Sequence, residues 1–176
     1  MIINESEMNF GDYAPERVFQ IENSELHLSF PSGTRTVEFV LLRKNNCLLF
    51  VEAKTSCPNA ANRNETEDKQ ADFEKFYCKV TDKFIDSLQM VLASAVRKNL
   101  DTTGMGRKIK EIGDYSGIKI KFVLVIKTAE NAEWLKGPQV ELETRLKRWK
   151  KLWKAEVVVL NEKMAEELGL LVPGSN

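Results

Sequence analysis

This sequence predicts a mixed fold of the α/β or α+β class, with a mixed central sheet flanked by helices. Two β-rich runs separated by a polar turn occupy residues 34–56, an amphipathic helical pattern covers residues 71–99, and a strongly apolar strand pattern covers residues 118–128. Strand and helix patterns that alternate along a chain are typical of sheets covered by helices. The 176 residues, 43% of them apolar, are enough for one packed domain and short for two. We therefore predict a single domain over residues 1–176.

The hairpin is predicted by its turn and the long helix by its periodicity. In TRTVEFVLLRKNNCLLFVEAKTS the two β-rich runs are separated by Lys44, Asn45 and Asn46, and asparagine tolerates the left-handed backbone that a short turn needs. A polar stretch at residues 59–68 precedes the helix. Apolar side chains then recur at three- and four-residue spacing at Phe73, Phe76, Tyr77, Val80, Phe84, Leu88, Val91 and Ala95.

The elements of the C-terminal half follow from apolar runs and from capping residues. The strand at residues 118–128 is apolar on both faces in its second half, as expected for a central strand covered on both sides. Pro138 is expected to open a helix that runs through Trp153, and residues 155–160 form another buried strand. Asn161 can cap the last helix, which Gly169 and Pro173 would end.

Charge and cysteine content narrow the setting of the protein. Lysines and arginines number 26 and aspartates and glutamates 26, so no global field attracts a polyanion and any contact with nucleic acid must be local. Cys47, Cys57 and Cys78 are an odd set without a paired spacing, which argues against disulfides or structural zinc. The acidic N-terminus is unlike a signal peptide, and no apolar run is long enough to span a membrane. We expect a cytoplasmic protein without a membrane partner.

The glycine-bearing segment DTTGMGRKIKEIGDYSG, residues 101–117, invites comparison with a phosphate-binding loop. Such loops follow a strand and open a helix, whereas this segment precedes a strand and lacks the Gly-Lys-Ser/Thr ending. We therefore expect a flexible surface loop without a phosphate site.

The register of the hairpin decides which charged side chains share a face. If the loop is Lys44–Asn46, Glu38 lies opposite Glu52, and Lys54 points to the same face because side chains repeat every two residues. A two-residue loop would instead pair Glu38 with Ala53 and send it to the other face. The odd loop therefore predicts two acids and a lysine clustered at the end of an apolar strand.

Two carboxylates opposed across a hairpin repel each other unless something offsets the repulsion. Mg²⁺ is the simplest candidate, because it takes one or two carboxylates together with water and phosphate oxygens. A metal held in this way polarises a phosphate and lowers the pKa of a bound water, and a nearby ammonium stabilises the charge that develops on phosphorus. This is chemistry that cleaves a phosphodiester.

The pattern of Val-Glu38, then Glu52-Ala53-Lys54 at the end of an apolar strand, then a long helix, resembles the PD-(D/E)XK nuclease superfamily. The resemblance covers residues 18–95 and implies a restriction endonuclease-like core. It also implies that Glu38, Glu52 and the carbonyl of Ala53 bind Mg²⁺ or Mn²⁺, that Lys54 is catalytic, and that the partner is nucleic acid, with DNA favoured. Homodimers are common in small members of the superfamily. The sequence departs from the family pattern at Val37, in place of proline, and at Glu38, in place of the commoner aspartate.

Many members of the superfamily add a glutamate from the first helix. PERVFQIENSEL contains Glu16, Glu22 and Glu25, and we favour Glu22, which precedes a Ser24 that can cap a helix. Which of the three glutamates points inward stays open at this stage.

Several other features have plainer explanations. A plainer interpretation of Glu52 and Lys54 is a solvated salt bridge at the end of a strand, with no further function. Lys83 and Gln89 could touch a phosphate, but they are read more simply as polar residues beside an apolar stripe. The helical segment at residues 140–156 carries tryptophans at core spacing and a basic outer face. His27, the only histidine, is expected at the surface or at a strand edge. A noncatalytic binding module on a nuclease-like fold is therefore the alternative function.

Overall fold

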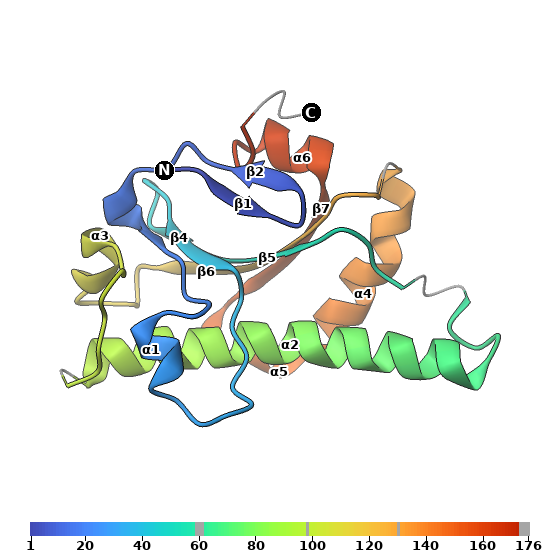
Figure 1. The fold of residues 1–176 in the computed structure, drawn as a ribbon, viewed down its shortest axis with the longest axis horizontal. Helices are drawn as coiled ribbons and strands as arrows, with labels where there is room; N and C mark the ends of the chain where they lie inside the picture. The colour runs from blue at the N-terminus through green and yellow to red at the C-terminus, as the bar shows by residue number, and fades with distance from the viewer. Residues whose placement is uncertain (59–61, 98, 130, 173–176) are drawn as a thin grey trace.

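A five-stranded mixed sheet lies at the centre of the computed structural model, which describes residues 1–58, 62–97, 99–129 and 131–172 (Figure 1). Its strands, in spatial order, are β3 (Val18–Phe19), β4 (Phe39–Leu42), β5 (Cys47–Lys54), β6 (Lys119–Ile126) and β7 (Glu156–Asn161). The first three strands are antiparallel, whereas β5, β6 and β7 are parallel. The predicted mixed sheet with flanking helices is therefore confirmed.

The hairpin has the odd loop that brings the two acids together. Leu42 pairs with Leu48 and Phe39 with Val51, and continuing this register by one residue places Glu38 opposite Glu52. Asn46 has a φ of 55°, in the left-handed region that asparagine tolerates. The register predicted from a Lys44–Asn46 loop is therefore confirmed.

Helices cover one face of the sheet because both parallel crossovers run on that side (Figure 1). The helices on this side are α1 (Glu25–Leu28), α2 (Glu67–Val96), α4 (Lys136–Arg145) and α5 (Lys147–Trp153). Phe50, Phe84 and Phe122 meet in this core, with ring centroids 5.1–5.9 Å apart. Crossovers between parallel strands have one preferred hand, so two successive crossovers that advance in the same direction place their helices on the same face.

The opposite face is covered by a second hairpin and a short helix. The hairpin consists of β1 (Ile3–Glu5) and β2 (Met8–Phe10), and α6 (Glu162–Glu167) lies beside it. Phe10 packs edge-on against Phe39, with ring centroids 5.3 Å apart. Both faces of the central strands are therefore buried, which explains the apolar run predicted over residues 118–128.

Two helical segments differ from their predicted boundaries. α2 begins at Glu67, earlier than predicted, because Thr66 caps it by accepting a hydrogen bond from the Lys69 amide. The helix expected from Pro138 to Trp153 is two helices that meet at Leu146, preceded by the short 3-10 helix η3 (Ala132–Leu135).

Asn161 caps α6, as predicted, through a hydrogen bond from the Met164 amide. Gly169 follows that helix with a φ of 64°, while Pro173 lies outside the described residues. No helix in the described part of the chain is both long and apolar enough to cross a membrane.

Part of the glycine-bearing segment is packed against the fold, which corrects the prediction of a flexible loop, although most of its residues lie at the surface as predicted. It contains α3 (Arg107–Lys110), and Met105 and Ile109 are buried in the core. The Gly106 amide donates a hydrogen bond to the Val18 carbonyl, next to the 3-10 helix η1 (Pro15–Arg17). A Cβ at residue 106 would lie 2.6 Å from the Glu16 carbonyl oxygen, so the contact requires glycine.

Candidate functional site

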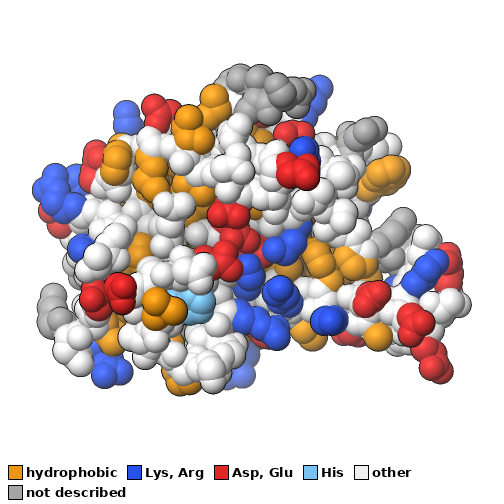
Figure 2. Space-filling model, in the orientation of Figure 1, with side chains coloured by type: hydrophobic (Ala, Val, Ile, Leu, Met, Phe, Trp, Pro, Cys, Tyr) orange, Lys and Arg blue, Asp and Glu red, His pale blue; other side chains and the backbone are white. Residues whose placement is uncertain are grey.

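The site is built where the apolar face of β5 ends. Leu48 and Phe50 lie in the helix-covered core, and Glu52 and Lys54 continue the same row of alternate side chains. Lys54 Nζ lies 2.6 Å from Glu52 Oε1 and 3.8 Å from Glu38 Oε1. The two carboxylates and the ammonium therefore share one face of the hairpin. Figure 2 shows acidic and basic side chains side by side near the middle of the molecular surface that it draws.

Lys83 of α2 completes the cluster from below the sheet. Its Nζ donates a hydrogen bond to Glu52 Oε2 at 3.0 Å and one to Glu38 Oε1 at 3.3 Å. The Lys83 side chain is 7% exposed, whereas that of Lys54 is 25% exposed. Lys83 is therefore an internal counter-ion, and Lys54 is the ammonium that reaches toward solvent.

Glu22 enters the cluster from the stretch just before α1. Ser24 caps that helix by accepting a hydrogen bond from the His27 amide, as the sequence predicts. The Glu22 carboxyl forms a hydrogen bond with Glu38 and lies 3.8 Å from Lys83 Nζ. The structure thus brings together Glu22, Glu38, Glu52 and Lys54, the side chains chosen from the sequence.

Burial and neighbouring charges shift the pKa values of Glu22 and Glu38, the outer pair of acids in the cluster. Burial, the hydrogen bond to Glu38 and the negative charge of Glu38 raise the pKa of Glu22 to about 7. Burial also acts to raise the pKa of Glu38, but the hydrogen bond donated by Glu22 and the charges of Lys83 and Lys54 outweigh it and leave this pKa below its usual value. Near pH 7 Glu22 is therefore protonated about half of the time, and its protonated form donates a hydrogen bond to the ionised Glu38.

The pKa values of Glu52 and Lys83, the inner pair of the cluster, are shifted mainly by burial and by their mutual attraction. Burial raises the pKa of Glu52, which is fully buried, and the charges of Lys54 and Lys83 offset only part of this effect. Burial acts to lower the pKa of Lys83, but Glu52 and Glu38 outweigh it and raise this pKa. With all three glutamates ionised, the cluster carries one more negative than positive charge, and the raised pKa of Glu22 removes part of this excess near neutral pH. A cation bound here would therefore favour release of the Glu22 proton.

Substitution of Glu22 tests this electrostatic balance. Between the ordinary pKa of 4.5 and the folded value of about 7, the folded state binds more protons at Glu22 than the unfolded state, so stability falls as pH rises through that window. Glu22→Gln keeps a hydrogen-bond donor toward Glu38 but does not titrate. In metal-free, low-salt buffer, we expect the Tm of Glu22→Gln to rise relative to the Tm of the wild type as the pH increases to about 8. A constant Tm difference across the range would contradict the raised pKa of Glu22.

The residues present fit a divalent cation in one specific respect. Glu52 Oε1 is fully buried and forms no hydrogen bond of good geometry, although Lys54 and Lys83 lie within ion-pair distance of it. An incompletely satisfied, buried carboxylate oxygen beside a second carboxylate is a suitable donor for Mg²⁺. Ala53 lies between Glu52 and Lys54 in β5, opposite Val125 of β6. Within the described ranges, no three acidic, histidine or cysteine side chains form a group that could hold a metal ion, so the donors available at this point are Glu38, Glu52 and main-chain oxygens.

The remaining sequence candidates lie elsewhere. His27 Nδ1 accepts a hydrogen bond from the Asn23 amide and Nε2 contacts the Thr34 carbonyl oxygen, so the ring is engaged within its own loop. Gln89 is exposed on α2. Trp149 and Trp153 pack against the core, as their spacing predicts.

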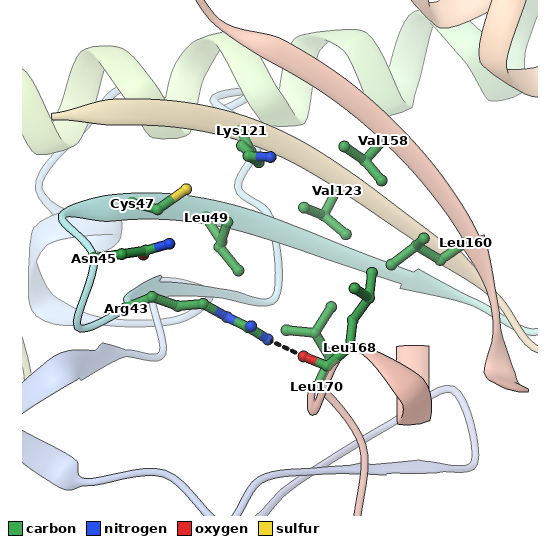
Figure 3. A pocket seen from close by; sticks show the side chains of 10 residues that line it. All are labelled: Arg43, Asn45, Cys47, Leu49, Lys121, Val123, Val158, Leu160, Leu168 and Leu170. Atoms are coloured by element: carbon green, nitrogen blue, oxygen red, sulfur yellow. Dashed lines mark hydrogen bonds between the residues drawn. The ribbon is translucent and has the colours of Figure 1, made fainter. Parts of the chain in front are cut away.

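A small pocket on the opposite face of the sheet is a weaker candidate (Figure 3). It measures about 140 Å³ and has an apolar floor formed by residues such as Leu49. Its two cations are already engaged, because Arg43 donates to the Leu168 carbonyl at 2.6 Å and Lys121 pairs with Glu156 at 2.6 Å. Burial raises the pKa of the Cys47 thiol, which disfavours the reactive thiolate.

Lys83, a member of the cluster, and Glu5, which is influenced by its charges, were not assigned to the cluster from the sequence. Lys83 lies between Val80 and Ser87 on the buried face of α2, and a lysine within an apolar stripe was the available signal. Glu5 of β1 has a pKa raised by burial and then by the charge of Glu38, which places it near the cluster. Three-residue strands such as β1 leave almost no periodic pattern, so no comparable signal marked Glu5.

Comparisons of the chain with protein-family models, with curated proteins and with solved structures gave no match.

Proposed function

We propose that the protein is a metal-dependent nuclease that hydrolyses phosphodiester bonds in nucleic acid, with DNA the favoured substrate, on a restriction endonuclease-like core. The observation that carries the proposal is the convergence of Glu38, Glu52 and Lys54 on one face of the hairpin, where the buried Oε1 of Glu52 lies 2.6 Å from Lys54 Nζ and 2.9 Å from Lys83 Nζ. The order of hairpin, long helix and parallel strand around this cluster supports the core that the family resemblance implies.

Each side chain has a distinct role in this proposal. Glu38, Glu52 and the carbonyl of Ala53 would hold Mg²⁺ or Mn²⁺, which supplies Lewis-acid activation of phosphate and water. Lys54, the more exposed ammonium, can reach a phosphate at the surface and stabilise its developing charge. Lys83 neutralises the buried carboxylates, and Glu22 positions Glu38 through their hydrogen bond.

Metal binding gives the first test. A cation that binds only the folded state must stabilise it, by about 1.4 kcal/mol at ten times its dissociation constant. We expect millimolar Mg²⁺ or Mn²⁺ to raise the Tm of the wild type and not of Glu52→Gln, which loses the anionic ligand. Differential scanning fluorimetry in matched ionic strength measures both proteins.

Glu111→Gln is the matched control, because Glu111 is an exposed glutamate that pairs with Arg107 away from the cluster. It should show the same metal response as the wild type. Absence of a metal-dependent shift, together with no cleavage of single-stranded, double-stranded or branched DNA or of RNA, would refute the nuclease.

One observation favours the alternative, a noncatalytic module that binds nucleic acid or protein. The Lys83 ammonium lies 2.9 Å from Glu52 Oε1 and 3.3 Å from Glu38 Oε1, so the carboxylates are partly neutralised without any metal. Binding of nucleic acid without metal-dependent stabilisation or cleavage would identify this second function.

A further inference from the structure

A groove of about 640 Å³ opens beside the acidic cluster, between the N-terminal half of α2 and the chain that follows β5. One wall begins at Ser56, two residues beyond Lys54, and the other includes Lys79, one helical turn from Lys83. A ligand in this groove would therefore extend directly from the proposed reacting centre.

The groove has a cationic lining on a protein whose total charge is zero. Four of its side chains are cationic, namely Arg63, Lys69, Lys75 and Lys79, and one is acidic, Asp72. Arg63 and Lys69 already contact Glu141 and Glu65. Lys75 and Lys79 are exposed and form no ion pair within the described ranges.

These two lysines form a row with the buried lysine of the cluster. Lys75, Lys79 and Lys83 are spaced four residues apart on α2, which puts successive side chains on the same side of the helix, about 6 Å apart along its axis. The row leads from the carboxylates outward along the groove. A polyanionic chain laid along α2 would meet one free ammonium per helical turn.

An aromatic ring on the same wall indicates which class of polyanion the groove can bind. Phe76 lines the groove beside Lys75, is partly exposed, and packs against the core and the Tyr77 ring. A ring fixed in this way can stack on a base only if the base is unpaired. Duplex DNA presents phosphates but no free base faces, and an acidic peptide has no matching ring system.

We propose that this groove binds a single-stranded segment of DNA, with phosphates on Lys75 and Lys79 and a base stacked on Phe76. The inference rests on the proposed function for the chemistry at the adjoining carboxylates. It adds that the strand next to the scissile bond is unpaired. The substrate class is therefore single-stranded DNA or DNA with a single-stranded flank.

Fluorescence anisotropy in metal-free buffer with EDTA tests the groove without cleavage. The probe is a labelled oligothymidine of about 12 nucleotides, within the site sizes of single-strand binders. We expect Phe76→Leu, which keeps the apolar packing, to weaken binding about tenfold. In Lys75→Gln/Lys79→Gln, the slope of log K against log salt should become shallower by about 1.4, because two phosphate contacts are lost.

Lys147→Gln/Lys151→Gln is the matched control, because these exposed lysines of α5 also stand four residues apart. Equal losses in both double variants would overturn the groove in favour of general polyanion attraction. Tighter binding of a blunt duplex, of oligouridine or of polyglutamate than of the probe would likewise overturn it. If binding follows the prediction but no metal-dependent cleavage occurs, the groove is supported and the nuclease is refuted. If cleavage occurs but the groove variants bind the probe as the wild type does, the nuclease is supported and the groove is refuted.

Discussion

Lys83→Met should lower the free energy of unfolding by about 3–5 kcal/mol in metal-free buffer, because it removes the buried ammonium and leaves Glu38 and Glu52 with only the more exposed Lys54 as counter-ion. Methionine fills much of the same space, so the loss reports charge rather than a cavity. Denaturant unfolding near neutral pH measures it. Mg²⁺ should stabilise this variant more than the wild type, because the metal no longer competes with a tethered cation.

Two companion variants separate this effect from general damage to α2. Lys79→Met, one turn away and exposed, should stay within about 0.5 kcal/mol of wild type. Adding Glu38→Gln to Lys83→Met should recover part of the lost stability, because one uncompensated charge is removed. If Lys83→Met were as stable as Lys79→Met, the ammonium would not be the counter-ion of the buried carboxylates.

Lys54→Ala should reduce metal-dependent cleavage of DNA about 10²–10³-fold while retaining the Tm increase produced by Mg²⁺. The reason is that Lys54 reaches solvent beside the carboxylates, whereas Lys83 also neutralises Glu38 and Glu52. Single-turnover cleavage and the metal-dependent Tm are measured on the same preparation. The two readouts distinguish loss of a catalytic group from loss of the metal.

Lys121→Ala supplies the control for this experiment. Lys121 is also a partly exposed strand lysine paired with a glutamate, but it lies on the opposite face of the sheet. It should cleave at the wild-type rate. Cleavage by Lys54→Ala at that same rate would remove Lys54 from the mechanism.

The part of the site formed by the hairpin could be predicted from local sequence. The turn residues located the loop and left two lengths open, and the three-residue loop found in the structure sets the register that places Glu38 opposite Glu52. Ser24 and Asn161 were likewise recognisable caps because capping is a local interaction. Each of these inferences needed only residues close together in the chain.

The contribution of α2 to the site depended on tertiary packing. Lys83 is 31 residues from Glu52 and 45 from Glu38, so its role appears only when the helix docks on the sheet. The glycine-bearing segment also depends on tertiary packing, because Gly106 lies against the backbone of Glu16 and donates a hydrogen bond to the Val18 carbonyl. Periodicity identifies a buried face but not the neighbours that the face will meet.

The opposed carboxylates of the hairpin also have a consequence for folding kinetics. A hairpin is a local structure that forms early, yet this one places Glu38 opposite Glu52 before any ammonium from α2 is present. Lys83 reaches both acids only after the chain closes a loop of at least 31 residues. In the isolated hairpin Lys54 offsets only part of this repulsion, and Lys83 adds a second ammonium when α2 docks. Hairpin and helix should therefore consolidate in the same transition state rather than one after the other.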